Sequence, residues 1–209
     1  MMISIKNFIL LLVFIFSISN SKAQDKDYLL LKKINDQYTP FGGGIMRGFS
    51  DSDTYLALGI PTGLFIYGKV KKNPEMVWNS FESFSNQLIN GVATTILKTT
   101  IDRTRPFVTY PDDIHKHSVA GSKSYPSGHT SMAFAAATSI SLQYPKWYVI
   151  APAFIYASGV GYSRMYLGVH YPTDVLAGAV LGAGSSFVTH YTFKFIKKRW
   201  ELKHSKAKI

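Results

Sequence analysis

Three apolar segments in the second half of the chain restrict its fold more than any other feature. They cover residues 130–144, 147–162 and 175–193, and each is 15 to 19 residues long. These lengths are marginal for a helix that crosses a bilayer, which takes about 20 residues. The segments are rich in Gly, Ala and Ser, and Gly178 and Gly182 form a small-xxx-small pair that lets helices pack closely. They predict membrane helices or, as the alternative, the buried helices of a soluble bundle.

Two further helices are predicted before these segments. Residues 54–67 are apolar apart from Gly and a kink expected at Pro61, and residues 75–97 carry apolar side chains at helical spacing. We expect this second helix to pack its apolar face on its neighbours. The apolar positions are Val77, Phe81, Phe84, Leu88, Val92 and Ile96. Residues 25–53 combine a short amphipathic piece with a loop-like run at 40–44, which predicts an exposed connector.

The first 23 residues have the features of a secretory signal peptide. Lys6 precedes an apolar stretch at residues 8–18 that is too short to span a hydrocarbon core of ~30 Å, and Ser21 and Ala23 suit a signal peptidase. An uncleaved first membrane helix is the alternative. Residues 24–209 are expected to form a single domain. The predicted fold class is all-α: a compact, membrane-embedded bundle of five helices after signal removal, or six if the N-terminal segment is retained.

Composition excludes some classes of chemistry. The chain has no Cys, which excludes disulfides, thiolate metal sites and Cys nucleophiles. Charged residues make up 17% of the chain, against a typical ~25%, and this deficit favours a membrane protein. The formal net charge is +11, and residues 194–209 contribute seven basic residues against one acidic residue. Because a basic flank beside an apolar helix is typical of an anchor at anionic lipid head groups, we expect a membrane, and no nucleic acid, as the partner.

Charge placement predicts how the helices would lie in a membrane. If residue 24 starts outside, the connections after residues 67 and 144 and the C-terminal tail face the cytoplasm, and all three carry Lys or Arg. The same helix count groups the polar residues of the other connections on the outer side. These residues are Lys98, Arg105, Ser127, His129, Arg164, His170 and Asp174. The predicted location is a bacterial-type inner membrane with the site facing the periplasm, and a soluble periplasmic protein is the alternative.

A histidine and a carboxylate lie four residues apart just before the last apolar segment. Asp174 is the only acidic residue between Ile114 and Trp200. A buried, unpaired charge is costly, so this carboxylate needs a partner, and His170 is the nearest candidate. A carboxylate that fixes the imidazole tautomer makes a histidine reactive. We therefore predict that His170 is a nucleophile and that Asp174 orients it.

Three cations accompany this pair. Lys98 lies near a predicted helix end, Arg105 lies in the loop beyond it, and Arg164 lies six residues before His170. Fixed cations suit a phosphate dianion, which Arg binds bidentately and Lys binds as a point charge. We predict that all three bind phosphate; for Lys98 and Arg105 the alternative is the basic flank that commonly follows a membrane helix.

The motif Ser127-Gly128-His129 stands directly before an apolar segment. Ser127 is predicted to cap the helix that follows, and a Gly beside a helix N-terminus offers free backbone N–H groups to an anion. His129 would then lie in the first turn, next to that anion. On these residues alone, an anion site at the helix N-terminus and a plain helix cap with an incidental histidine are both open.

Together, these motifs resemble the signature of the type-2 phosphatidic acid phosphatase superfamily. The matching parts, in chain order, are Lys98 with Arg105-Pro106, then Pro126-Ser127-Gly128-His129, then Ser163-Arg164 with Gly168, His170 and Asp174. The superfamily also includes bacterial non-specific acid phosphatases and vanadium haloperoxidases. A match in three parts is far more specific than any one of them.

The resemblance implies an all-helical fold and metal-free hydrolysis of a phosphomonoester through a phosphohistidine. His170 would attack phosphorus, Asp174 would hold its tautomer, and His129 would protonate the leaving alkoxide and then activate water. The phosphate oxygens would be held by Lys98, Arg105, Arg164, Ser127 and the Gly128 N–H. We expect no metal and no cofactor, since the carboxylates near the motifs are Asp174 and, in a loop, Asp112 and Asp113.

The other histidines are interpreted as structural or peripheral. His115 and His117 are expected to be loop residues that line the substrate entrance. His190 in the last apolar segment and His204 in the basic tail are expected to be structural.

Four functions are open on the sequence alone. The first is a membrane-embedded phosphatase acting on a lipid phosphate or diphosphate of the phosphatidate, phosphatidylglycerophosphate, undecaprenyl diphosphate or lipid A type. The second is a soluble exported acid phosphatase acting on small phosphomonoesters. The third is a vanadate-dependent oxidant enzyme, and the fourth is a non-catalytic phospholipid-binding membrane protein. The sequence does not determine the substrate or the oligomeric state.

Overall fold

The computed structural model describes residues 21–206, with side chains for residues 25–203. The predicted signal peptide at residues 1–23 therefore lies outside the described residues, apart from its last three. The expectation for His204 also lies outside the described side chains.

Residues 21–206 contain seven helices and the loops that connect them, which confirms the predicted all-α class. They are α2 (Ser21–Asn35), α3 (Pro40–Val70), α4 (Pro74–Ile101), α5 (Pro106–Thr109), α6 (Gly128–Gln143), α7 (Trp147–Tyr166) and α8 (Pro172–Lys206). The five predicted helices correspond to α3, α4, α6, α7 and α8. Within these residues, no helix combines the length and the apolar content that crossing a membrane requires.

Local sequence explains where the longest helices start. The Thr39 hydroxyl accepts a hydrogen bond from the Gly42 N–H at 3.0 Å, and Pro40 takes the first position of α3. Asn73 and Pro74 begin α4 in the same way. In both helices a polar cap satisfies a backbone N–H, and Pro occupies a position whose N–H would have no partner in the helix.

The predicted exposed connector at residues 25–53 is wrong, because these residues form α2 and the first half of α3. The glycines in this stretch do not end the helix. A Cβ added at Gly42 would meet the Tyr166 hydroxyl, so glycine permits a close approach between α3 and α7. The same hydroxyl accepts a hydrogen bond from the Thr39 N–H at 3.0 Å. The glycine run is therefore a packing contact rather than a loop.

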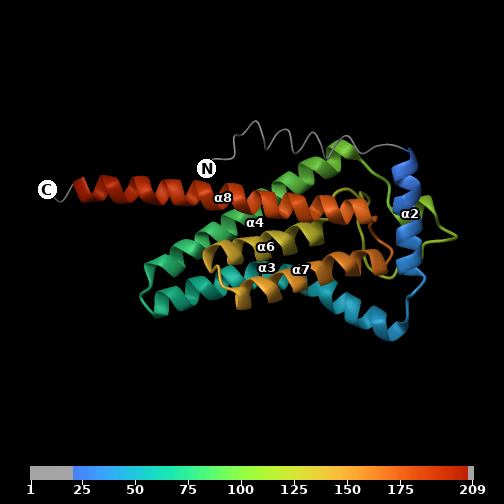
Figure 1. Ribbon diagram of the computed structural model, residues 1–209, viewed down its shortest axis with the longest axis horizontal. Helices are drawn as coiled ribbons and strands as arrows, with labels where there is room; N and C mark the ends of the chain where they lie inside the picture. Colours follow the sequence, from blue (N-terminus) through green and yellow to red (C-terminus); the bar gives the residue numbers. More distant parts are fainter. Residues whose placement is uncertain (1–20, 207–209) are drawn as a thin grey trace.

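Helix α6 lies at the centre of the bundle and contacts α3, α4, α7 and α8. Figure 1 shows the long helices running roughly along one axis, with α2 lying across the end where α7 finishes and α8 begins. The last turn of α4 and the first turn of α6 lie towards the same end. The polar residues that helix counting grouped together are therefore brought to the α2 end of the bundle.

Small residues set the distance between α6 and α8. A Cβ added at Gly178 would meet the Ser127 carbonyl, and one added at Gly182 would meet the backbone of α6 at Ser131. The predicted close packing of this small-xxx-small pair is confirmed. The contact also holds the start of α6 against the start of α8, where the Ser127 N–H donates to the Asp174 carbonyl at 3.0 Å.

The polar face of α4, rather than its apolar face, packs into the bundle. Asn86 donates to the Ala135 carbonyl at 3.1 Å and to the Ser186 hydroxyl at 2.8 Å. Phe81 and Leu88, which were predicted to pack on neighbouring helices, are instead 51% and 70% exposed. The prediction is wrong because periodicity identifies two unlike faces without telling which one faces inward. Hydrogen bonds between polar side chains hold this interface together.

We predict that Gly182→Ala destabilises the bundle by about 1–3 kcal/mol, because the added Cβ overlaps the backbone of α6. Gly91→Ala is the matched control, since Gly91 lies in α4 with open space around it. There, Ala should be neutral or stabilise the protein by up to about 1 kcal/mol. Thermal unfolding followed by circular dichroism measures both variants. Equal stability of the two would contradict the close packing of α6 on α8.

Candidate active site

Several separate parts of the chain supply polar residues to the α2 end. Lys98 lies in the last turn of α4. Asp102 then ends this helix in the left-handed conformation, with a φ of 50°, and the loop that follows carries Arg103 and Arg105. The remaining predicted residues are Ser127, Gly128 and His129 at the start of α6, Arg164 in the last turn of α7, and His170 and Asp174 around the start of α8.

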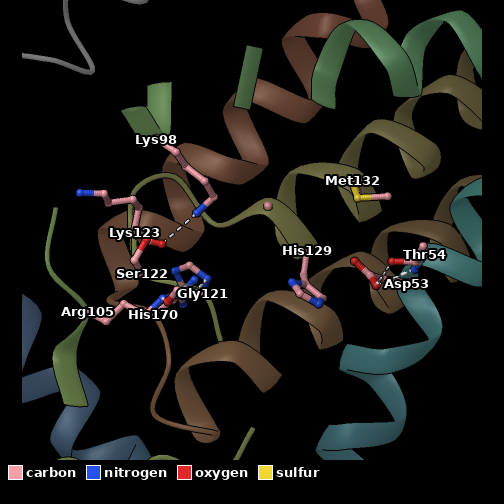
Figure 2. A pocket seen from close by; sticks show the side chains of 11 residues that line it. Asp53, Thr54, Lys98, Arg105, Gly121, Ser122, Lys123, His129, Met132 and His170 are labelled. Carbon is pink, nitrogen blue, oxygen red and sulfur yellow. Dashed lines mark hydrogen bonds between the residues drawn. The ribbon is translucent and has the colours of Figure 1, made fainter. Parts of the chain in front are cut away.

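Two neighbouring cavities open between these residues, with volumes of about 450 Å³ and 690 Å³. They share Arg105, Gly121 and His129, and Arg164 lines the second. The predicted residues that line the first cavity are Lys98, Arg105, Gly128, His129 and His170 (Figure 2). Ser127 and Asp174 line neither cavity. The structure thus brings six of the eight predicted site residues to the cavity walls.

His170 is 1% exposed, and its two ring nitrogens have different neighbours. Nε2 lies 3.1 Å from a guanidinium nitrogen of Arg105, and Nδ1 lies 3.4 Å from a carboxylate oxygen of Asp174. Because a guanidinium group can only donate, Nε2 must accept, and the proton of the neutral ring is on Nδ1, facing the carboxylate. Burial lowers the pKa of His170 to about 4, against the opposing effect of Asp174. The ring is therefore neutral at pH 7, with its unprotonated nitrogen beside Arg105.

The loop that carries His170 depends on Gly168. Its φ of 71° lies in the left-handed region that favours glycine, and an added Cβ would meet the His115 carbonyl. Asn35 of α2 supports the same loop by donating to the Tyr166 carbonyl at 3.0 Å and to the His115 carbonyl at 3.1 Å. Helix α2, which contributes no motif residue, therefore helps to hold the histidine in place.

Asp174 is fully buried and has a second ionic partner besides His170. Arg103 donates to its Oδ1 at 2.7 Å, while its Oδ2 accepts hydrogen bonds from the Ser124 hydroxyl at 2.5 Å and the Tyr171 N–H at 2.9 Å. The prediction that His170 is its partner is therefore incomplete, since the contact with the imidazole is the longest of the four. Burial raises the pKa of Asp174, but contacts with His170, Arg103 and Ser124 outweigh burial and keep the pKa below its usual value.

Arg103 joins α8 to α2, and sequence reasoning missed it. Its guanidinium group donates to Asp27 of α2 at 2.7 Å and lies 3.9 Å from the centre of the Tyr171 ring. Asp27 in turn accepts a hydrogen bond from the Thr173 N–H at 2.9 Å. In the sequence, Arg103 differs from Arg105 only by its distance from the following proline. No local signal therefore tells which arginine pairs with buried carboxylates and which one lines the cavities.

His129 stands in the first turn of α6 and lines both cavities. Figure 2 shows its ring in the space between His170 and Asp53. Burial lowers the pKa of His129 to about 3, and the charges of Arg164 and other cations lower it as well. Its imidazole is therefore neutral at pH 7 while the cavity holds no anion. Negative charge in the cavity would raise this pKa.

The cations around the cavities are buried close to one another. Burial and the charge of Arg105 lower the pKa of Lys98 to about 8 and that of Arg164 to about 10. Burial also lowers the pKa of Arg105. All three remain protonated at neutral pH, at a cost in mutual repulsion. A bound dianion would remove that cost, so the cavities are suited to a phosphate group.

Ser127 caps α6, as predicted. Its hydroxyl accepts a hydrogen bond from the Thr130 N–H at 3.4 Å, and its side chain is fully buried. Gly128 is the first residue of the helix, where the backbone N–H has no partner within the helix, and it lines the first cavity. The Gly128 N–H is thus better placed than the Ser127 hydroxyl to meet an anion.

The structure agrees with part of what was expected for the remaining histidines. His117 lines the second cavity and stacks on the Tyr38 ring with 3.4 Å between the ring centres, whereas His115 lines neither cavity. His190 lies 2.9 Å from the Glu82 carboxylate, between α8 and α4, which fits a structural residue.

Within residues 25–203, no group of three or more His, Cys, Asp or Glu side chains could hold a metal ion. The positive charge at the cavities comes from the predicted residues Lys98, Arg105 and Arg164 together with three further basic residues, Arg47, Lys116 and Lys123. That hydrolysis needs no metal stays a prediction.

Comparison with known proteins identifies related chains. The family model described as the PAP2 superfamily matches residues 84–198. The chain is 30% identical over 168 residues to a lipid A 1-phosphatase of Rhizobium etli, and this match covers 70% of the chain and 68% of that protein. It is 47% identical over 66 residues to an undecaprenyl-diphosphatase of Sulfolobus acidocaldarius, a match that covers 32% of each. The matched part is thus about two thirds of the first relative's length and about a third of the second's.

Two solved structures have the same fold. The transmembrane PAP2 type phosphatidylglycerolphosphate phosphatase of Bacillus subtilis superposes with a TM-score of 0.73 and 27% identity, covering 90% of this chain and 94% of that one. Aquifex aeolicus LpxE superposes with a TM-score of 0.65 and 29% identity, covering 78% of this chain and 93% of that one. The likeness therefore extends well beyond the residues of the motifs.

We predict that anion binding takes up a proton. At pH 6 the His129 imidazole is neutral in the anion-free cavity, because its pKa lies near 3, and a bound dianion raises that pKa. Sulfate is a suitable probe because it does not titrate near this pH. Calorimetry in two buffers of different ionisation enthalpy should give an uptake of up to about one proton per sulfate.

The control for this measurement is His129→Gln, which should bind sulfate without proton uptake. The same uptake in this variant, or none in the wild type, would contradict the assignment of the titrating group to His129.

We also predict that Arg103→Gln destabilises the protein by about 3 kcal/mol or more, because Asp27 and Asp174 would remain buried without their cation. Arg47→Gln is the matched control, since Arg47 is exposed and donates only a 3.4 Å hydrogen bond to the His117 carbonyl. Its effect should stay within about 0.5 kcal/mol. Chemical denaturation compares the two, and a loss of similar size in both would rule out a special role for Arg103.

Proposed function

Since the chain belongs to the PAP2 superfamily, we propose that it is a phosphoric monoester hydrolase that acts on a lipid phosphate or diphosphate through a phosphohistidine at His170. The observation that carries this proposal is the position of His170 Nε2. This nitrogen lies 3.1 Å from a guanidinium nitrogen of Arg105, which can only donate, and His170 lines a cavity bordered by further cations. A nucleophilic nitrogen beside cations suits attack on a phosphate dianion.

In the first step, the bound phosphate takes over the hydrogen bond that Arg105 donates to Nε2 of His170, which frees the lone pair of that nitrogen. Nε2 then attacks phosphorus and the bond from phosphorus to the leaving oxygen breaks. The imidazole becomes positively charged as the N–P bond forms, and Asp174 stabilises that charge across the 3.4 Å contact with Nδ1. Since Asp174 is also bonded to Arg103, its carboxylate keeps a fixed orientation. Asp174 is thus proposed to orient His170 and to stabilise its charged form.

His129 is proposed to move the protons. The substrate dianion raises its pKa, so that the protonated imidazole donates to the leaving alkoxide in the first step. The neutral imidazole then accepts a proton from the water that attacks phosphorus, the N–P bond breaks, and inorganic phosphate leaves. One histidine can serve both steps, because donating its proton in the first step leaves His129 neutral and able to accept a proton in the second.

The phosphoryl oxygens are proposed to be held by Lys98, Arg105, Arg164 and the Gly128 N–H. Ser127 contributes by capping α6, which keeps that N–H at the cavity. Charge stabilisation by fixed donors is the main source of catalysis in phosphoryl transfer. The cations would supply here what bound metal ions supply in other phosphatases.

A membrane location is proposed from the outer surface of the bundle. The long helices carry large apolar side chains outward, while the interface of α4 is polar. Examples of exposed apolar residues are Leu58 and Ile66 of α3, Leu88 and Val92 of α4, Ile155 of α7, and Phe187 and Tyr191 of α8. Lipid acyl chains would cover such a surface, which favours the membrane enzyme over a soluble acid phosphatase.

The orientation is proposed from the charges at the two ends of the bundle. Lys69 lies in the last turn of α3, and Lys71 and Lys146 lie in the connections that follow α3 and α6. Figure 1 shows these helix ends opposite the α2 end, and the basic end of α8 extends the same way. Basic connections favour the cytoplasmic side, so the cavities would face the periplasm of a bacterial-type inner membrane.

We predict that the purified protein releases phosphate from phosphatidate in mixed micelles, with EDTA present, and that His170→Ala lowers kcat by at least about 10³-fold because it removes the nucleophile. His115→Ala is the matched control, since His115 is exposed and lines neither cavity. Its activity should stay within about twofold of wild type. Full activity in His170→Ala would refute the proposed mechanism, and loss of activity with EDTA would refute metal-free hydrolysis.

A further inference from the structure

One carboxylate in the first cavity takes no part in the chemistry proposed above. Asp53 of α3 is 2% exposed and lines the cavity. Its Oδ1 accepts hydrogen bonds from the Thr54 N–H at 2.5 Å and the Thr54 hydroxyl at 3.1 Å. Its Oδ2 is buried and has no hydrogen-bond partner among the described residues. An unpaired buried acceptor is costly, so Oδ2 is expected to meet a donor that a ligand brings.

The position of Asp53 in the cavity suggests a contact with the leaving group of a substrate. Figure 2 shows His129 between His170 and Asp53, and all three side chains line the same cavity. In an in-line displacement, the nucleophile and the leaving group lie on opposite sides of phosphorus. His170 is the proposed nucleophile and His129 the proposed donor to the leaving oxygen. Asp53 therefore lies where the leaving group continues beyond that oxygen.

The charge of Asp53 restricts what can bind there. Burial raises its pKa to about 6, so the carboxylate is mostly ionised at pH 7. A carboxylate repels a phosphate group, so this end of the cavity is a poor place for a second phosphate. A cationic ligand group is disfavoured as well, because Arg164 is close enough to influence Asp53 and Lys98 lines the same cavity. A neutral hydrogen-bond donor fits both constraints.

We propose that Asp53 binds a free hydroxyl group of the leaving alcohol, close to the ester oxygen, and so prefers phosphate esters of hydroxylated lipids, such as monoacylglycerols or sugar lipids, over esters without that hydroxyl, such as phosphatidate. This inference rests on the proposed function. A hydroxyl donates one hydrogen bond to Oδ2, which is charge-assisted because Oδ2 belongs to a carboxylate, and it leaves the charge balance of the cavity unchanged.

The test uses two substrates that differ by one hydroxyl. They are 1-O-hexadecylglycerol 3-phosphate, whose free 2-hydroxyl lies next to the ester carbon, and its 2-deoxy analogue, 3-hexadecyloxypropyl phosphate. The measured quantity is the ratio of their kcat/KM values in the same mixed micelles. For the wild type, the hydroxylated substrate should be preferred by about tenfold or more, which corresponds to one hydrogen bond to a charged group.

Variants assign the preference to Asp53. In Asp53→Asn the ratio should fall to about threefold or less, because a neutral amide makes a weaker hydrogen bond. Asp51→Asn is the matched control, since Asp51 is exposed and lines only the second cavity, and its ratio should equal that of the wild type. The ratio is independent of how much folded enzyme each preparation contains.

The outcomes separate this inference from the proposed function. Hydrolysis of both substrates by the wild type at equal kcat/KM, or an unchanged ratio in Asp53→Asn, would overturn the inference alone. Hydrolysis of neither substrate would overturn the proposed function, and the inference with it. A ratio that falls in Asp53→Asn but not in Asp51→Asn would establish the hydroxyl subsite.

Discussion

The two ion pairs of Arg103 hold together the end of the bundle where the cavities lie. Arg103 donates to Asp27 of α2 and to Asp174 of α8, at 2.7 Å in both cases. Asp174 in turn contacts His170, so the orientation of the imidazole depends on a residue that does not line either cavity. Breaking a buried ion pair leaves an uncompensated charge, which makes this link sensitive to substitution of any of its members. The position of His170 is therefore tied to the stability of the fold.

The electrostatics of the cavities follow from the way the helices meet. Lys98, Arg105 and Arg164 come from three separate parts of the chain and are buried within reach of one another. Their repulsion makes the anion-free state unfavourable, and it keeps the His129 imidazole neutral. Binding of a dianion reverses both effects at once. In the proposed mechanism, the group that relieves the repulsion would also raise the pKa of His129 and let it act as an acid, which would couple substrate binding to proton transfer.

The sequence predicted the reactive end of the molecule better than the remainder. The motifs of α6, α7 and α8 lie beside helix ends that antiparallel packing must bring together, so counting helices was sufficient to group them. The contributions of α2 and α3 could not be predicted in this way. Asp27 and Asp53 lie in a stretch whose Gly run has the composition of a loop. Asp27 pairs with Arg103, 76 positions away, and Asp53 lines a cavity with residues of later helices, so neither role has a local signal.

The orientation of α4 was not predictable for a different reason. Its polar and apolar faces were visible in the sequence, but the choice of the inward face depends on what surrounds the bundle. In water the apolar side chains of Phe81 and Leu88 would be expected inside, whereas in the structure Asn86 and Asn90 fill the interior. Periodicity alone carries no information about the surrounding solvent.

The most direct test of the central claim is to trap phosphate on His170. With p-nitrophenyl phosphate, the leaving group needs no proton, so His129→Ala should still form the covalent intermediate but hydrolyse it slowly for lack of a base. Rapid quenching at high pH, followed by mass spectrometry of the peptides, should find the phosphoryl group on His170, with a burst of nitrophenol of about one equivalent. Release of nitrophenol without a burst and without phosphate on His170, or with phosphate on another residue, would contradict the account.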